Sequence, residues 1–93
     1  MKQNAQSMDK RLLFRLNRAI TCIDADKPDK IFNEDLSEVR MYARILNKEN
    51  RATKEIYKIT DGILLKAKHS KEEKEVLVKQ LRALQKEMMK QAL

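Results

Sequence analysis

The chain has 93 residues, with 21 lysines and arginines against 14 aspartates and glutamates, and its formal net charge is +7. A chain this short forms a single domain and buries only about two thirds of the surface of its unfolded form. The single cysteine, Cys22, excludes an intrachain disulfide framework, and no apolar run approaches the roughly 20 residues of a membrane span. The basic balance favours acidic partners, such as nucleic acid, an anionic membrane surface or an acidic protein.

The composition predicts an all-α fold, because glycine and proline occur once each and no segment alternates apolar and polar residues over the length of a strand. We expect residues 1–7 to be a disordered lead-in and residues 8–93 to be a single helical domain. Three helices are expected, at about 8–24, 34–68 and 71–91, in a helical bundle completed by oligomerisation, with a dimer favoured. Four helices are expected if the long central one breaks near 47–51.

The first predicted helix has a core stripe and one aromatic residue opposite to it. Leu12, Leu16 and Ile20 recur at the spacing of a buried face. At about 100° per residue, Phe14 projects away from that stripe. The cations around it are Lys10, Arg11, Arg15 and Arg18. Phe14 therefore either stacks on a base or fills a partner's groove, or it covers a neighbouring helix or a second subunit.

The connector at 24–33 carries Asp24, Asp26 and Asp29 but does not have the pattern of a calcium loop. An EF-hand needs a glycine at its sixth position and a glutamate at its twelfth, where this chain has Asp29 and Asp35. Pro28 disfavours helix at the residue before it, so the first helix should end there. The carboxylates are expected to form a turn and to favour the start of the next helix, with Asn33 as its N-cap.

A basic stripe runs along the predicted central helix, because its cations recur three or four residues apart. They would lie on one side over roughly 27 Å if the helix is unbroken. Such a stripe either follows the phosphates of a nucleic acid or is a solvated face. Its members are Arg40, Arg44, Lys48, Arg51, Lys54 and Lys58.

The apolar positions of the same segment fall into two sets that differ in direction by roughly 120°. One straight partner helix cannot cover both sets. Either different helices pack on the two halves, or the helix breaks at the polar run 47–51. If the helix breaks, the basic stripe breaks too, and the nucleic-acid hypothesis loses its main support. The first set is Leu36, Val39, Ala43 and Leu46, and the second is Ala52, Ile56, Ile59 and Ile63.

The last predicted helix begins with a capping box, in which Ser70 is followed by Glu73. Leu77, Leu81 and Leu84 continue its apolar stripe. Met88 and Met89 suit either an adaptable interface or the end of the core.

The inventory of side chains contains no signature of an enzyme, a metal centre or a cofactor site. One histidine and one cysteine cannot form a zinc site alone, and neither phosphate-binding glycine motif occurs. Without an apolar leader, the lone Cys22 indicates the cytoplasm.

Two classes of function remain. Net charge slightly favours a nucleic-acid-associated accessory or regulatory factor that contacts phosphates through the basic helix face. The alternative is a protein-interaction module, such as an adaptor, assembly factor or inhibitor, that binds an acidic or apolar partner through Phe14, Met88 and Met89. A membrane-surface contact through the basic first helix is a weaker third possibility.

Overall fold

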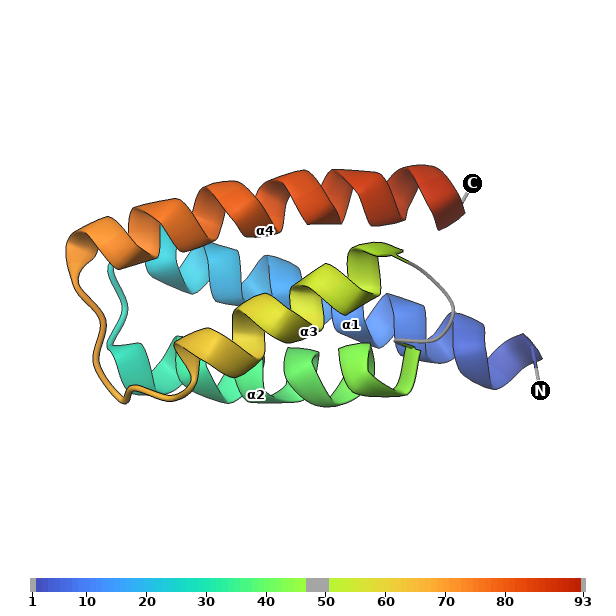
Figure 1. The fold of residues 1–93 in the computed structure, drawn as a ribbon, viewed down its shortest axis with the longest axis horizontal. Coiled ribbons are helices and arrows are strands. Elements are labelled where there is room, and N and C mark those ends of the chain that lie inside the picture. The colour runs from blue at the N-terminus through green and yellow to red at the C-terminus, as the bar shows by residue number, and fades with distance from the viewer. Residues whose placement is uncertain (1, 47–50, 93) are drawn as a thin grey trace.

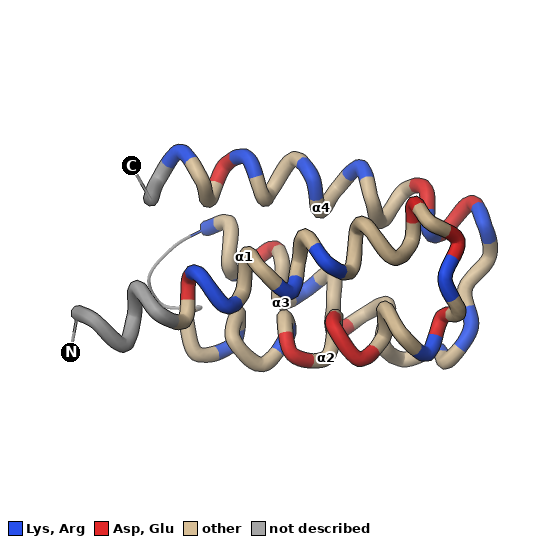
Figure 2. Tube along the Cα trace, turned by 180° about the vertical axis from the view of Figure 1, so that it is seen from behind, with Lys and Arg blue, Asp and Glu red and all other residues tan. Residues whose placement is uncertain are grey.

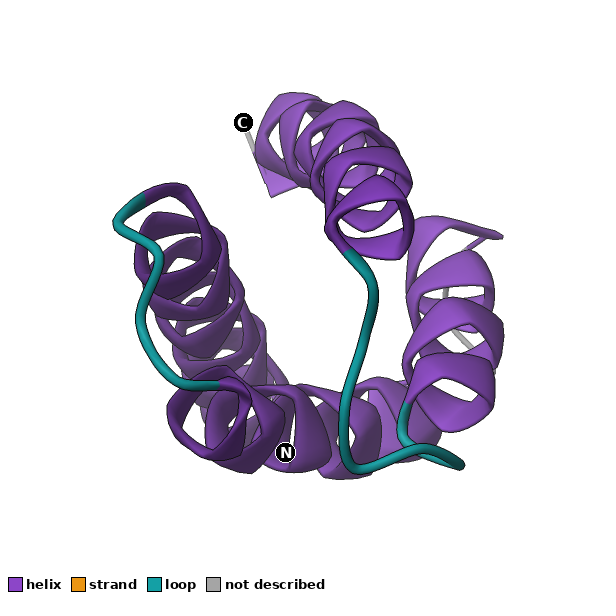
Figure 3. Ribbon diagram, turned by 90° about the vertical axis from the view of Figure 1, so that its left-hand side faces the viewer, coloured by secondary structure: helices purple, strands orange, loops and turns teal. Residues whose placement is uncertain are grey.

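The computed structural model of the protein describes residues 2–46 and 51–92, with side chains over 8–46 and 51–90. Its four helices are α1 (Lys2–Asp24), α2 (Asp29–Leu46), α3 (Arg51–Ile63) and α4 (Lys71–Ala92). Consecutive helices run in opposite directions, so the chain goes up, down, up and down along a bundle (Figure 1). The first and last helices also pack against each other, so that each helix has two neighbours around a common interior (Figure 3).

The all-α class is confirmed, but the count of three helices is wrong and the four-helix alternative holds. The predicted helix 34–68 is two antiparallel helices, α2 and α3, that pack against each other. The reversal resolves the 120° difference between the two apolar sets, because a chain that turns back can direct both towards the same interior. Leu36, Val39 and Leu46 of α2 and Ala52 and Ile56 of α3 are all buried in one core.

The other predicted boundaries differ by small amounts. α1 begins at Lys2 instead of about residue 8, and α2 begins at Asp29 instead of 34. α3 ends at Ile63, one residue after Gly62, instead of continuing to 68. α4 agrees with the predicted range to within a residue, and its capping box is confirmed: the Glu73 amide donates to Ser70 Oγ at 3.1 Å, and the Ser70 amide donates to Glu73 Oε1 at 3.0 Å.

α1 ends in a Schellman motif that no glycine supports. The Lys27 amide donates to the Cys22 carbonyl at 2.9 Å, and the Asp26 amide donates to the Ile23 carbonyl at 3.0 Å. In this motif the residue that donates the shorter-range bond has a left-handed backbone conformation, and Asp26 adopts this conformation with φ 57°. Pro28 then prevents the helix from resuming, and α2 starts at the next residue.

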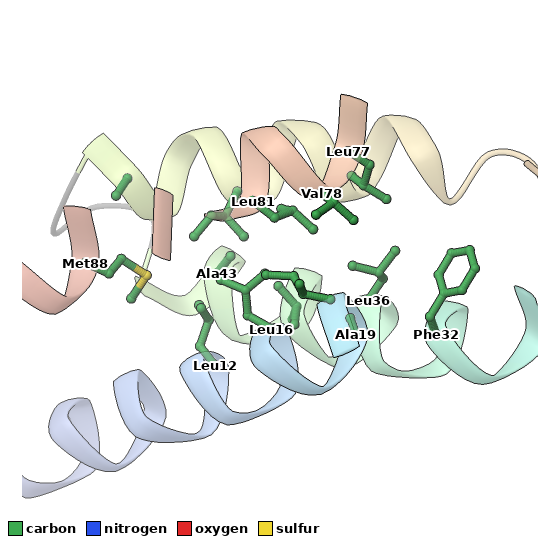
Figure 4. Close-up of a cluster of buried hydrophobic side chains, with 14 of the residues drawn as sticks. Leu12, Leu16, Ala19, Phe32, Leu36, Ala43, Leu77, Val78, Leu81 and Met88 are labelled. Carbon is green, nitrogen blue, oxygen red and sulfur yellow. The ribbon is translucent and has the colours of Figure 1, made fainter. Parts of the chain in front are cut away.

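The core lies between all four helices, and large aliphatic side chains fill it (Figure 4). Leu12 and Leu16 of α1 meet Leu36 of α2 and Leu81 of α4, all without solvent exposure. Phe32 is fully buried near the start of α2. Within the described part of the chain, no helix is long and apolar enough to cross a membrane.

Candidate binding surface

A hollow between α1 and α2 is formed around Phe14. This side chain is 63 % exposed, because it projects from α1 on the side opposite the core residues Leu12 and Leu16. None of the described side chains of the other helices covers it. The hollow encloses about 430 Å³, and it is lined by Lys10, Arg11, Phe14, Arg15 and Tyr42.

One exposed apolar side chain of α2 lies next to this hollow. Ile45 is about half exposed and follows Tyr42 by one helical turn, whereas the exposed Met41 lines a different hollow, between α2 and α3, with Arg44 and Tyr57. The Tyr42 hydroxyl donates to Glu38 Oε2 at 3.3 Å, which orients the ring at the edge of the hollow. We call the surface formed by Lys10, Arg11, Phe14, Tyr42 and Ile45 the α1–α2 face.

Two of the four predicted cations of the first helix hold α1 against α2. Arg15 donates to Asp35 Oδ1 at 2.9 Å and lies 3.4 Å from Glu38 Oε2, while Arg18 lies 3.5 Å from Asp35 Oδ2. Asp35 is buried, and its hydrogen bond raises the pKa of Arg15 above its ordinary value. Lys10 and Arg11 make no ion pair with any described residue, so their charges stay available on the α1–α2 face.

The basic stripe predicted for the central helix is divided between α2 and α3, which run in opposite directions. Arg40 lies 3.3 Å from Asp61 and thereby joins the two helices, and Lys58 lies 3.9 Å from Glu55 one turn away. Lys48 is outside the described residues. The remaining members are exposed and make no ion pair within the described part of the chain: Arg44, Arg51 and Lys54.

Basic residues are spread over all four helices and do not form one continuous line (Figure 2). Arg44 lines a second hollow with Tyr57 of α3, next to the Arg40–Asp61 pair. No single helix therefore carries the predicted 27 Å row of cations that could follow the phosphates of a nucleic acid.

The two methionines proposed as interface residues have different environments. Met88 is buried in the core between α4 and the other helices, whereas Met89 is 55 % exposed. Met89 lies on α4, whereas Phe14 lies on α1, and Met89 is not among the residues that line the hollow around Phe14.

A polar cluster fastens the α3–α4 connector to the start of α2, and sequence reasoning missed it. The His69 amide donates to Asp29 Oδ2 at 2.8 Å, and Lys74 Nζ lies 2.7 Å from Asp29 Oδ1. The ion pair with Lys74 is the main reason that the pKa of Asp29 is below its ordinary value. We call Asp29, Asn33, His69 and Lys74 the polar latch.

Asn33 is part of this latch and is not an N-cap, because it lies inside α2. Its side-chain nitrogen donates to the Ala67 carbonyl at 3.0 Å, and its oxygen lies 3.1 Å from His69 Nε2. The only local signal for this arrangement was the polar character of Asn33 and His69. Their 36-residue separation gave no means of pairing them.

Metal-binding geometry does not occur in the described residues, since no group of three or more histidine, cysteine or acidic side chains converges there. Cys22 is partly buried beside the core. Neither the family models nor the curated proteins nor the solved structures compared with this chain match it. Its function is therefore inferred from its own side chains.

Proposed function

We propose that this protein is a non-enzymatic helical binding module that docks an acidic protein segment on the α1–α2 face. The observation that carries the proposal is the position of Phe14, which is mostly exposed beside Lys10 and Arg11, two cations that make no ion pair with a described residue. A large apolar ring kept in water costs solvation free energy that a partner would recover. Two neighbouring positive charges select a partner with carboxylates.

The apolar residues around Phe14 favour a protein partner over a nucleic acid. Aromatic residues and arginine are enriched at protein interfaces, and this face combines Phe14, Tyr42 and Arg11. Bases stack on flat aromatic rings, but the exposed aliphatic side chain of Ile45 offers them no such surface. A helix with one apolar stripe and flanking glutamates has the complementary chemistry.

The test is fluorescence anisotropy with a labelled amphipathic peptide of about 18 residues, five helical turns, with leucines along one side and glutamates elsewhere. We expect saturable binding that Phe14→Ala weakens at least about 10-fold, the loss of one anchor residue. Arg11→Glu should also weaken it. Leu65→Ala is the matched control, because Leu65 is even more exposed but lies in the α3–α4 connector. Binding that is absent, or unchanged in Phe14→Ala, contradicts the proposal.

Nucleic-acid association is a second candidate, supported by three exposed cations that make no ion pair with a described residue: Arg44, Arg51 and Lys54. They belong to two adjacent helices and would contact phosphates by charge alone. Titration of a thymidine 20-mer and a duplex at two salt concentrations tests this candidate. The candidate fails if neither nucleic acid binds with a dissociation constant below about 10 µM at low salt. It also fails if joint charge reversal of Arg44 and Arg51 changes the affinity no more than the control substitution Lys79→Glu on α4 does.

A further inference from the structure

A groove between α3 and α4 is distinct from the α1–α2 face. It encloses about 470 Å³, and the apolar side chains that line it are Ile59, Ile63, Val76 and Leu77. Val76 is 55 % exposed on the α4 side. The groove therefore presents an apolar strip to solvent along two antiparallel helices.

Gly62 leaves the α3 wall of this groove open. An added Cβ at this position would meet nothing within 4 Å, and the residue does not have positive φ, so neither crowding nor backbone conformation requires glycine here. Glycine in a helix is nevertheless unfavourable relative to alanine. In a packed helix interface, a side chain of one helix inserts into a gap on the surface of the other. The exposed Val76 can act as such a side chain, and the open position at Gly62 can act as the gap.

The charges at the two ends of the groove have opposite sign. Lys66 and Glu73 pair at 3.1 Å where α3 ends and α4 begins, so they neutralise each other, and Glu72 at that end makes no ion pair with a described residue. Lys58 lies eight residues before Lys66, at the opposite end, 74 % exposed and only weakly paired with Glu55. One end is therefore net negative and the other net positive.

We propose that this groove is the interface between two copies of the protein related by a two-fold axis. Such an axis reverses the groove, so Lys58 of each copy faces Glu72 of the other, and Val76 of each copy packs over Gly62 of the other. The α1–α2 face lacks this self-complementarity, because the charged residues that line its hollow are all cations and none of them could pair with Lys10 and Arg11 of a second copy. The interface does not depend on the function proposed for the α1–α2 face.

The dimer is expected to be weak. Two helices about 10 Å in diameter, with α3 about 20 Å long, present a flat area of roughly 400 Å², about half of the 800 Å² per partner in a stable complex. A dissociation constant of roughly 10 µM to 1 mM follows for an interface at this small end of the range.

Sedimentation equilibrium from about 5 µM to 2 mM, a range that spans this constant, tests the proposal. We expect the average mass to rise from 11.0 kDa towards twice that value. Val76→Asp should keep the protein monomeric throughout. Met89→Asp is the matched control, because Met89 is also 55 % exposed on α4 but lies outside the groove, and it should dimerise like the original protein.

Two further experiments separate the interface from an effect on folding. Gly62→Gln should raise the midpoint of thermal unfolding, since glutamine favours helix more than glycine does, and yet weaken dimerisation by filling the hole. Lys58→Glu and Glu72→Lys should each abolish dimerisation alone, whereas an equal mixture of the two variants should dimerise, because both charge contacts are then attractive.

A chain that stays monomeric up to 2 mM overturns the proposal and leaves the groove to a different partner. A dimer that survives Val76→Asp, or charge variants that do not recover on mixing, places the interface elsewhere and overturns it equally.

Discussion

The backbone amide of His69 donates a hydrogen bond to the carboxylate of Asp29, 40 residues earlier in the chain. The second oxygen of the same carboxylate pairs with Lys74, so one side chain of α2 holds both the connector before α4 and the first turns of α4 itself. The Lys74 ammonium also lies 5.6 Å from the centre of the buried Phe32 ring. The polar latch therefore connects directly to the core.

Asp29→Ala should lower the free energy of unfolding by about 2 kcal/mol, because it removes an ion pair and leaves a partly buried amide without an acceptor. Asp29→Asn should cost about 1 kcal/mol, since its amide oxygen can still accept from His69. Urea unfolding followed by circular dichroism measures both values. Glu34→Ala, an exposed acid on the same helix, is the control and should change stability little. Equal losses for Asp29→Ala and Glu34→Ala would show that the latch does not stabilise the fold.

Stability should fall when the pH drops below about 5. The Ser70 amide and then Lys66 lower the pKa of Glu73 from 4.5 to about 2, and Lys74 lowers the pKa of Asp29. Because both pKa values are lower in the folded protein, their stabilising effect is complete above the unfolded values and is lost as the pH falls through the folded values.

Glu73→Gln should therefore flatten the dependence of the unfolding free energy on pH between 5 and 2, the interval set by these pKa values. Glu75→Gln on the same helix serves as the control. A pH profile that is the same in Glu73→Gln as in the original protein would rule out this role for Glu73.

Asp26→Gly should stabilise the protein by about 1 kcal/mol. Asp26 has φ 57°, which an L-residue adopts at a cost and glycine adopts freely. The two Schellman hydrogen bonds, one of them donated by the Asp26 amide itself, join backbone atoms only, so the substitution keeps them. Asp26→Ala should have no such benefit. Thermal unfolding of the two variants distinguishes them, and a glycine variant no more stable than the alanine variant would contradict the expectation.

Arg15→Ala should destabilise the bundle more than Arg18→Ala. Arg15 makes the 2.9 Å bond to the buried Asp35, while Arg18 is more exposed and lies 3.5 Å away. Removing Arg15 leaves a buried carboxylate with a poorer partner, and replacing both members by apolar residues should recover stability. A cycle of Arg15→Leu, Asp35→Leu and the double variant measures this coupling by urea unfolding. Additive effects of the two substitutions would mean that the pair is not coupled.

Local patterns predicted the helices well and their pairing poorly. The α4 capping box and the core stripe of α1 each need only neighbouring residues, so both were visible in the sequence. The break between α2 and α3 was visible as a conflict between two apolar sets and as the polar run at 47–51, which left both three and four helices open. Neither set could show whether a second subunit or a reversal of the chain resolves that conflict, because this depends on packing between distant segments.

For the candidate surface, too, the features of a single helix could be predicted from the sequence, whereas the contacts between helices could not. The exposure of Phe14 follows from its angle on one helix, and the structure agrees. The sequence could not tell that Arg15 and Arg18 pair with Asp35 whereas Lys10 and Arg11 stay unpaired, because Asp35 belongs to another helix. Nor could it place Tyr42 beside Phe14.

The closure of the bundle by α1 and α4 has a consequence for the order of folding. Contacts of α1 with α2 and of α2 with α3 join neighbouring helices, whereas contacts of α1 with α4 close a loop of most of the chain and carry the larger entropic cost. We therefore expect α4 to dock last, beginning at the latch beside Asp29 and proceeding towards Met88. Its amides should be the first in the core to exchange with deuterated solvent, from the C-terminal end inwards.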